Sequence, residues 1–199
     1  MTAQVYSQLA LRGFRRSGEY VYTPRCSQCK DCIPARIPVN DFKPNRSQKR
    51  CWNLNQDILV SQTEPKFKEE HFKLYRKYIS HRHSGGGMDN PDPEQYLSFL
   101  TSSWSDTVFF EFRLQQTLLA VAVVDNMEQG LSAVYTFFDP DHSQRSLGVL
   151  AILWEIQEVK QRGLSWLFLG YWIKECKKMS YKGAYRPLEI LRDGVWKRA

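Results

Sequence analysis

The chain of 199 residues is long enough to bury a sizeable core, as one large domain or as two small ones. Its hydrophobic content of 42%, with 14% aromatic residues, is typical of a globular protein and excludes a disordered one. The net charge of +7 and the pI near 9.2 favour polyanionic partners such as nucleic acid.

Features that would direct the chain to a membrane or out of the cell are missing from the sequence. No apolar run approaches the roughly 20 residues that span a bilayer, and the first residues do not form a charged-then-apolar signal segment. The five cysteines are an odd number, which does not suit a fully disulfide-bonded secreted domain. We therefore expect a cytoplasmic protein with no membrane partner.

The chain begins with a predicted helix. Thr2 is a suitable N-cap, and apolar residues recur at helical spacing until Gly13. Arg15 and Arg16 follow. They could satisfy the last carbonyl groups of this helix, or they could contact phosphate groups.

A cysteine loop comes next, with the spacing C-x2-C-x2-C at Cys26, Cys29 and Cys32. Thiolates at this spacing can bind zinc or an iron–sulfur cluster, and Cys51 is the only plausible fourth ligand. The alternative is a set of reduced thiols without a ligand. The segment 33–39 alternates apolar residues with two prolines, which predicts a strand confined to a sheet edge.

A basic stretch and a strand complete the first part of the chain. Lys43, Arg46, Lys49 and Arg50 lie within eight residues, a pattern that suits a phosphodiester backbone and equally a solvated surface. A strand is predicted over 57–63. The Glu64-Pro65 pair then marks a domain boundary, so we expect domains at 1–63 and 64–199.

The second part begins with a helix whose first turn should contain Pro65. A glycine-rich loop at 83–88 and a short helix capped by Asp92 follow. Strands are predicted over 107–114, 117–125 and 131–138, then a helix over 147–162 and a strand over 166–169. This order is typical of the N-acetyltransferase-like (GNAT) fold, so the predicted fold class is α+β: a small N-terminal α+β domain followed by a GNAT-like domain.

The start of the 147–162 helix is a candidate acyl-binding element. Free backbone N–H groups at a helix N-terminus suit an anionic or carbonyl-bearing ligand, and Ser146 and Gly148 lie there. Acetyl-CoA enzymes of this fold usually show Q/R-x-x-G-x-G/A at this point. Arg145 and Gly148 match that pattern, whereas Leu150 stands where the last small residue is expected.

Several phrases of the sequence resemble those of one family, the bacterial aspartate/glutamate leucyltransferases, relatives of the arginyl-tRNA–protein transferases. The phrases cover nearly the whole chain: Gly13 through Gly18, Tyr22 through Pro34, Arg36 through Val39, Phe42, Arg46 through Arg50, His83 through Met88, Tyr96, Tyr171 through Ile173, Lys178-Met179, Tyr181-Lys182 and Pro187 through Glu189. The resemblance implies a transferase that moves leucine from leucyl-tRNA to proteins beginning with Asp or Glu and so marks them for degradation. It also implies some tens of residues, with another cysteine, ahead of the first helix.

That reaction needs no nucleophilic side chain. The attacking N-terminal amine ordinarily has a pKa of about 7.7–8.0, and the donor is an activated ester, so positioning and oxyanion stabilisation can supply most of the catalysis. We expect no required cofactor and assign no catalytic residue. The candidates for the other roles are Arg82, Arg145 and Lys174 for the acidic acceptor residue, Tyr75, Tyr135, Phe137, Ser146 and Gly148 for the leucyl group, and Arg15, Arg16, Arg46, Lys49 and Arg50 for tRNA phosphates.

Two other functions remain open. A GNAT acetyltransferase that uses acetyl-CoA would keep the fold and change the donor, although Leu150 argues against it. A non-enzymatic nucleic-acid-binding protein with a metal knuckle would explain the charge and the cysteines, but it leaves the predicted second domain without a purpose.

Overall fold

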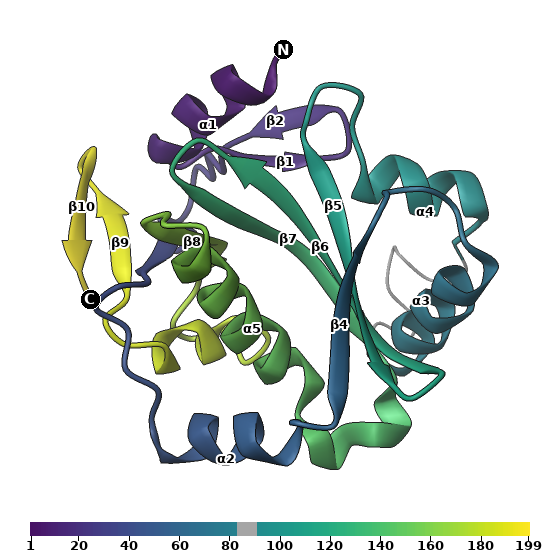
Figure 1. Ribbon diagram of the computed structural model, residues 1–199. Helices are drawn as coiled ribbons and strands as arrows, with labels where there is room; N and C mark the ends of the chain where they lie inside the picture. The colour runs from purple at the N-terminus through teal and green to yellow at the C-terminus, as the bar shows by residue number, and fades with distance from the viewer. Residues whose placement is uncertain (83–90) are drawn as a thin grey trace.

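The computed structural model describes residues 1–82 and 91–199. Within them the chain folds around one large, strongly curved sheet with helices on both of its faces (Figure 1). The glycine-rich loop expected at 83–88 lies outside the described residues. None of the described helices combines the length and the apolar character that crossing a membrane requires.

The described residues form an eight-stranded sheet in the order β10-β9-β3-β8-β7-β6-β5-β4. Neighbouring strands are antiparallel except for β7 and β8, which are parallel. The meander β5–β6–β7 was predicted, and so was the helix α5 between β7 and β8. The strand bounds are β3 (Ile33–Pro38), β4 (Ile58–Thr63), β5 (Thr107–Leu114), β6 (Thr117–Met127), β7 (Gly130–Phe138), β8 (Trp166–Trp172), β9 (Glu189–Arg192) and β10 (Val195–Arg198).

Helices cover the sheet on both faces because the strands alternate apolar side chains between the two sides. On one face, Ala122 and Val124 of β6 share a core with α5 and α2. On the other, Val121 and Val123 share a core with α3 and α4, while Phe168 of β8 packs with α1. The helix bounds are α1 (Ala3–Leu11), α2 (Arg46–Leu54), α3 (Glu69–Arg82), α4 (Pro93–Leu100) and α5 (Leu147–Gln161), with short 3-10 helices η1 (Pro140–Arg145) and η2 (Ser180–Ala184).

The helix starts follow local side-chain chemistry in most cases. Thr2 and Asp92 cap α1 and α4, as their sequences predicted. The prediction that Pro65 lies in the first turn of α3 is wrong. The Lys66 N–H bonds to the Glu64 carbonyl at 2.8 Å, so these residues form a turn and the helix begins only at Glu69.

The predicted edge position of β3 is also wrong. β3 lies inside the sheet, with β8 along its whole length on one side and β9 on the other. The prolines are tolerated because β9 pairs only with Ala35 and Arg36, so Pro34 and Pro38 fall outside that ladder. Since β3 and β4 pair with strands of the second half of the chain, the sheet continues across the boundary expected at residue 63, and that division stays a prediction.

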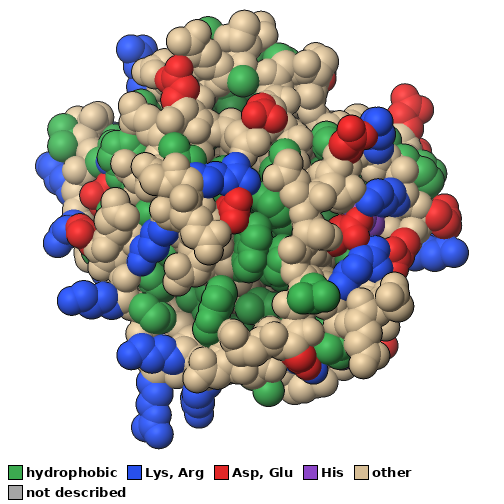
Figure 2. Space-filling view, in the orientation of Figure 1, with side chains coloured by type: hydrophobic (Ala, Val, Ile, Leu, Met, Phe, Trp, Pro, Cys, Tyr) green, Lys and Arg blue, Asp and Glu red, His purple; other side chains and the backbone are tan. Residues whose placement is uncertain are grey.

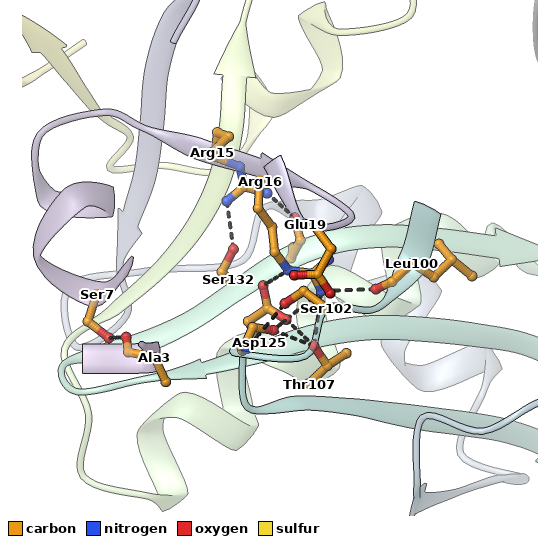
Figure 3. Close-up of polar contacts among 12 residues, drawn as sticks. Ala3, Ser7, Arg15, Arg16, Glu19, Leu100, Ser102, Thr107, Asp125 and Ser132 are labelled. Atoms are coloured by element: carbon orange, nitrogen blue, oxygen red, sulfur yellow. Dashed lines mark hydrogen bonds and ion pairs between the residues drawn. The ribbon is translucent and has the colours of Figure 1, made fainter. Parts of the chain in front are cut away.

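A buried ion pair attaches the N-terminal segment to this sheet. The strand β1 (Arg15–Ser17) forms a two-stranded sheet with β2 (Tyr20–Tyr22). Arg16 makes two 2.6 Å contacts with the carboxylate of Asp125 on β6, and both side chains are fully buried (Figure 3). The same guanidinium donates to the Leu100 carbonyl at 2.9 Å and to the Thr107 hydroxyl at 3.0 Å. β1 is thereby fixed against β5, β6 and the end of α4.

Replacing Asp125 with Ala should strongly destabilise the protein. The change leaves the Arg16 guanidinium buried without its counter-ion, and breaking a buried pair in this way costs about 3–5 kcal/mol. Urea unfolding of both proteins measures the difference. The matched control is Asp106→Ala, which removes an exposed carboxylate near the start of β5. Equal unfolding midpoints for Asp125→Ala and the wild type would contradict the role given to the pair.

Candidate active site

The central parallel strands pair over only part of their length, and the interval between their unpaired parts is called the gap. The pairing of β7 with β8 joins Gly130–Ser132 to Trp166–Phe168. Beyond this stretch β7 continues beside β6 to Phe138, and β8 continues beside β3 to Trp172. The two strands therefore diverge, and the groups between them are available for other contacts.

Arg15 enters this gap from the face that carries α1 and α4. It donates to the Ser132 hydroxyl at 2.7 Å and to the Ala133 carbonyl at 2.5 Å, both on β7 (Figure 3). On the opposite side it lies against β8, since a Cβ on Gly170 would come within 3.1 Å of the Arg15 Nε. Gly170, with φ +75°, thus provides both the backbone conformation and the space that the guanidinium needs.

This placement corrects the expected position of two arginines. Arg15 and Arg16 were assigned to a basic surface for tRNA phosphates, but they are only 9% and 5% exposed. Arg16 neutralises Asp125, and Arg15 crosses the gap. Their guanidinium groups are therefore internal, and neither belongs to an outer basic face.

Glu155 approaches the same gap from the opposite face. It lies on α5 between Ala151 and Val159, one turn away on either side, and all three side chains are fully buried. Neither carboxyl oxygen has a hydrogen-bond partner among the described residues. Burial raises the pKa of Glu155 to about 8, and the positive charge of Arg15 offsets part of that rise.

The 3-10 helix η2 adds two further polar side chains. Lys182 is buried and donates from Nζ to the Tyr171 carbonyl of β8 at 2.5 Å. Burial lowers the pKa of Lys182 to about 7, and repulsion by Arg15 contributes to the decrease. Burial, and after it the nearby Glu155 carboxyl, raises the pKa of Tyr181, whose side chain remains 45% exposed. Tyr181 therefore borders both the solvent and the gap.

Glu155, Tyr181 and Lys182 were not among the candidate residues. A signal for Glu155 was present in the sequence, since it is an acidic residue on the apolar face of an amphipathic helix. Tyr181 and Lys182 were noticed only as one of the phrases that resemble the leucyltransferase family, and no role was assigned to them.

The aromatic candidates for the leucyl pocket divide into two groups. Tyr75 and Phe137 are 2% and 0% exposed and pack against each other, with ring centroids 5.3 Å apart. Burial raises the pKa of Tyr75 to about 12. Both residues belong to the core under α3, whereas Tyr135 is only partly buried on the diverging part of β7. Tyr135 is thus the one of the three that borders the gap.

The candidates at the start of α5 have structural partners. Arg145 holds the Asp57 carboxylate through contacts of 2.8 and 2.9 Å. Ser146 adopts a left-handed conformation with φ +51°, and a Cβ on Gly148 would lie 3.1 Å from the Phe138 ring, so a larger residue there would require the ring to shift. The side chain of Leu150 is buried in the core. The charge of Arg145 is therefore already neutralised by Asp57, and the start of α5 is occupied by protein side chains.

The other two acceptor candidates are exposed. Arg82 ends α3, and Lys174 follows β8. Burial raises the pKa values of Tyr78 and Tyr135, and the charge of Arg82 offsets part of each rise. Arg82 is therefore close to Tyr135, which borders the gap, and to Tyr78, which packs against Tyr135.

The basic stretch at 43–50 was predicted without a helix, and the structure places its last three cations on one side of α2. Arg46, Lys49 and Arg50 are all exposed and lie three and four residues apart, while Gln48 and Cys51 face inward. Lysine and arginine side chains gather along the lower left margin of the molecule in Figure 2, where Figure 1 places α2. The Gln48 amide donates to the Ala184 carbonyl of η2 at 3.2 Å, so this basic face lies next to the segment that borders the gap.

The cysteine loop does not form the four-ligand site that was considered. Cys26, Cys29 and Cys32 line one surface cavity of about 380 Å³. Burial raises the pKa of Cys32, and repulsion between thiolates of this loop adds to the rise. Cys51 lies instead in the core, where its thiol contacts the carbonyl groups of Arg145 and Ser146 at 3.6 Å. Across residues 1–82 and 91–199, no cluster of three or more potential ligands is arranged to hold a metal ion. Zinc or an iron–sulfur cluster at this loop stays a prediction, and the reaction proposed for the gap does not require it.

Replacing Glu155 with Gln should change how stability depends on pH. The folded protein keeps a proton on Glu155 up to about pH 8, whereas the unfolded chain releases it near pH 4.5, so the wild-type free energy of unfolding falls between these values. Glutamine does not titrate. The stability of the variant relative to the wild type should therefore rise across this window, by at most about 1.4 kcal/mol per pH unit, and level off above it.

Urea unfolding of both proteins at several pH values measures this difference. The control is Glu158→Gln on the same helix, because Glu158 forms an outer ion pair with Arg162 at 2.7 Å. A difference between Glu155→Gln and the wild type that stays constant from about pH 5 to pH 9 would show that Glu155 titrates normally.

Comparison with known proteins assigns the chain to a family. The family model described as arginine-tRNA-protein transferase, C terminus, matches residues 70–192, and the corresponding N-terminus model matches residues 1–50. The chain is 51% identical to an aspartate/glutamate leucyltransferase of Alcanivorax borkumensis, over 99% of this chain and 81% of that one. It is 54% identical to the enzyme of that name from Nitrosococcus oceani, over 96% of this chain and 81% of that one.

Solved structures with low sequence identity share the fold. FemX aligns with a TM-score of 0.55 and 11% identity, over 87% of this chain and 61% of its own. L-PGS from Bacillus licheniformis aligns with a TM-score of 0.54 and 13% identity, over 72% of this chain and 46% of its own. These likenesses confirm the predicted α+β, GNAT-like fold. From its family matches, the chain belongs to the arginine-tRNA-protein transferase family, among the aspartate/glutamate leucyltransferases, and is an aminoacyl-tRNA–protein transferase.

Proposed function

We propose that this protein transfers leucine from leucyl-tRNA to the N-terminal Asp or Glu of acceptor proteins, at the gap between β7 and β8. The observation that carries the proposal is the set of buried titratable side chains in that gap, Arg15, Glu155 and Lys182, beside the exposed basic face of α2. Such a site can receive the aminoacyl end of a tRNA while the nearby cations hold its phosphates. The names of the relatives support leucine as the transferred group and Asp and Glu as the acceptors.

The reaction exchanges an ester for an amide. The neutral N-terminal amine attacks the carbonyl carbon of the leucyl ester, a C–N bond forms, and the C–O bond to the tRNA ribose breaks. The proton lost by the amine passes to the ribose oxygen that leaves. The positive charges of Arg15 and of protonated Lys182 favour the oxyanion that develops on the carbonyl oxygen, because charge stabilisation is strong where water is excluded.

The acceptor's first side chain needs a cation at the rim of this gap. Arg82 meets that need, since it is exposed and lies near Tyr78 and Tyr135. A guanidinium can bind the Asp or Glu carboxylate through two parallel hydrogen bonds. Arg145 is less suited because it already binds Asp57.

The acetyl-CoA alternative has less support. The start of α5 is closed by Phe138 packed on Gly148 and by the buried Leu150, so it lacks the open glycine-rich turn of acetyl-CoA enzymes. The binding-protein alternative does not account for the buried charges in the gap.

Neutralising the basic face of α2 should weaken tRNA binding and its dependence on salt. Each phosphate contact contributes about 0.9 to the slope of log affinity against log salt for a duplex, so Arg46→Ala with Arg50→Ala should flatten the slope by up to twice that amount. Filter binding of leucyl-tRNA at several salt concentrations gives the slope. The control is Arg192→Ala with Lys197→Ala, two exposed cations of the β9–β10 hairpin at one end of the sheet. Equal slopes for the α2 variant and the wild type would place the tRNA elsewhere.

Acceptor choice should depend on charge. Peptides that begin with Asp or Glu should receive labelled leucine, and those that begin with Asn or Gln should lose about tenfold to hundredfold in rate, since an unpaired cation costs about 1–3 kcal/mol. Arg82→Met should remove this Asp/Asn discrimination and leave leucyl-tRNA affinity intact. Arg76→Met, on the same helix, is the control. Transfer from acetyl-CoA and not from leucyl-tRNA would overturn the proposed function, and no transfer from either would favour a binding protein.

A further inference from the structure

Glu155 is a buried titratable group to which the proposed reaction gives no role. Its side chain is 0% exposed, and over residues 1–82 and 91–199 neither of its oxygens finds a hydrogen-bond donor. A carboxyl group buried in this way destabilises the fold, because its lost contacts with water are not replaced. A group with that cost and with no structural partner indicates a ligand.

The charged neighbours of Glu155 do not satisfy it. Arg15 reaches the gap from the other face of the sheet, and two of its N–H groups already donate to Ser132 and Ala133 of β7. Lys182 donates to the Tyr171 carbonyl. Tyr181 and Tyr185 are close enough for the Glu155 carboxyl to raise their pKa values, after the larger effect of burial. The carboxyl thus lies among donors that are directed to other acceptors, or that lie near it without a hydrogen bond.

The aminoacyl donor supplies the missing hydrogen-bond donor. A leucyl ester carries an α-amino group on the carbon next to the reacting carbonyl, and that group is cationic or neutral near neutral pH. In either protonation state it can donate to a carboxylate or share a proton with a carboxyl group. An ammonium–carboxylate contact shielded from water is stronger than a neutral hydrogen bond.

We propose that Glu155 binds the α-amino group of the aminoacyl donor and holds the ester carbonyl in the gap between β7 and β8. This inference rests on the proposed function, since it concerns the same site and the same donor. Tyr181 borders both Glu155 and the solvent, so the donor enters along this side chain. Glu155 is then the residue that separates aminoacyl donors from simple acyl donors, which have no group to pair with it.

The test compares two donors on the wild type and three variants. One donor is leucyl-tRNA, and the other is the same tRNA acylated with 4-methylpentanoate, which keeps the leucine side chain and the ester and has hydrogen in place of the α-amino group. The variants are Glu155→Gln, Glu155→Leu, which has no polar atom, and the control Glu158→Gln. The measured quantity is kcat/KM for transfer to a peptide beginning with Asp, and thermal melting confirms that each protein is folded.

Glu155→Gln should lower kcat/KM for leucyl-tRNA by about tenfold to hundredfold, the range expected for a hydrogen bond to a charged group. Glu155→Leu should lose at least as much. Both variants should keep the wild-type rate with 4-methylpentanoyl-tRNA within about twofold, and Glu158→Gln should match the wild type with both donors. A loss of kcat/KM that occurs only with the donor that has an α-amino group assigns the effect to the contact with Glu155, since a general effect of the substitution would lower the rate with both donors.

Equal losses on the two donors would overturn the inference, because they would show that Glu155 acts on the fold or on the acceptor. No loss with leucyl-tRNA would overturn it as well. The proposed function is tested separately by the wild type, since failure of the wild type to transfer leucine at all would refute that function and leave no donor for Glu155 to bind.

Discussion

The ion pair between Arg16 and Asp125 joins the two halves of this chain at the point where the site is built. Both side chains are fully buried, and the guanidinium also binds a carbonyl at the end of α4 and a hydroxyl on β5. Four contacts from one side chain leave β1 little freedom. Because Arg15 precedes Arg16 on the same short strand, fixing Arg16 against β6 directs Arg15 across β7 toward Gly170. A residue from the N-terminal segment thus becomes part of a site whose walls come from the GNAT-like sheet.

The gap itself follows from the topology. β7 and β8 are the only parallel neighbours among the described strands, and α5 connects them. The two strands separate after three residue pairs, so buried polar groups can approach from both faces of the sheet. Arg15 comes from the side of α1, and Glu155 comes from α5. The buried Glu155 carboxyl lowers the stability of the fold because it has no hydrogen-bond partner, and a bound ligand could supply that partner. Functional sites commonly contain residues that reduce stability in this way.

The meander and α5 could be predicted from the sequence because hydrophobic periodicity is a local property. The positive charge of the stretch 43–50 was also visible, but the helix α2 that carries most of it was not predicted. The role of β3 could not be predicted in the same way. Its prolines suggested an edge, and only the short length of β9 explains why an internal position is allowed. Arg15 and Arg16 were expected on the surface for a related reason. Their partners Ser132 and Asp125 lie more than a hundred residues away along the chain, and no local sequence pattern predicts contacts between residues so far apart.

Glu155 was only partly predictable. The sequence shows a glutamate on the apolar face of α5, but it does not show that this side chain reaches the gap. Whether this carboxyl receives the aminoacyl donor decides how the site works. The most direct measurement is a crystal structure of the protein with a non-hydrolysable leucyl-adenosine, in which an amide replaces the ester. We expect the leucyl group between β7 and β8, with its α-amino nitrogen within hydrogen-bond distance of the Glu155 carboxyl. A leucyl group bound elsewhere, with Glu155 still enclosed and unpartnered, would contradict that assignment.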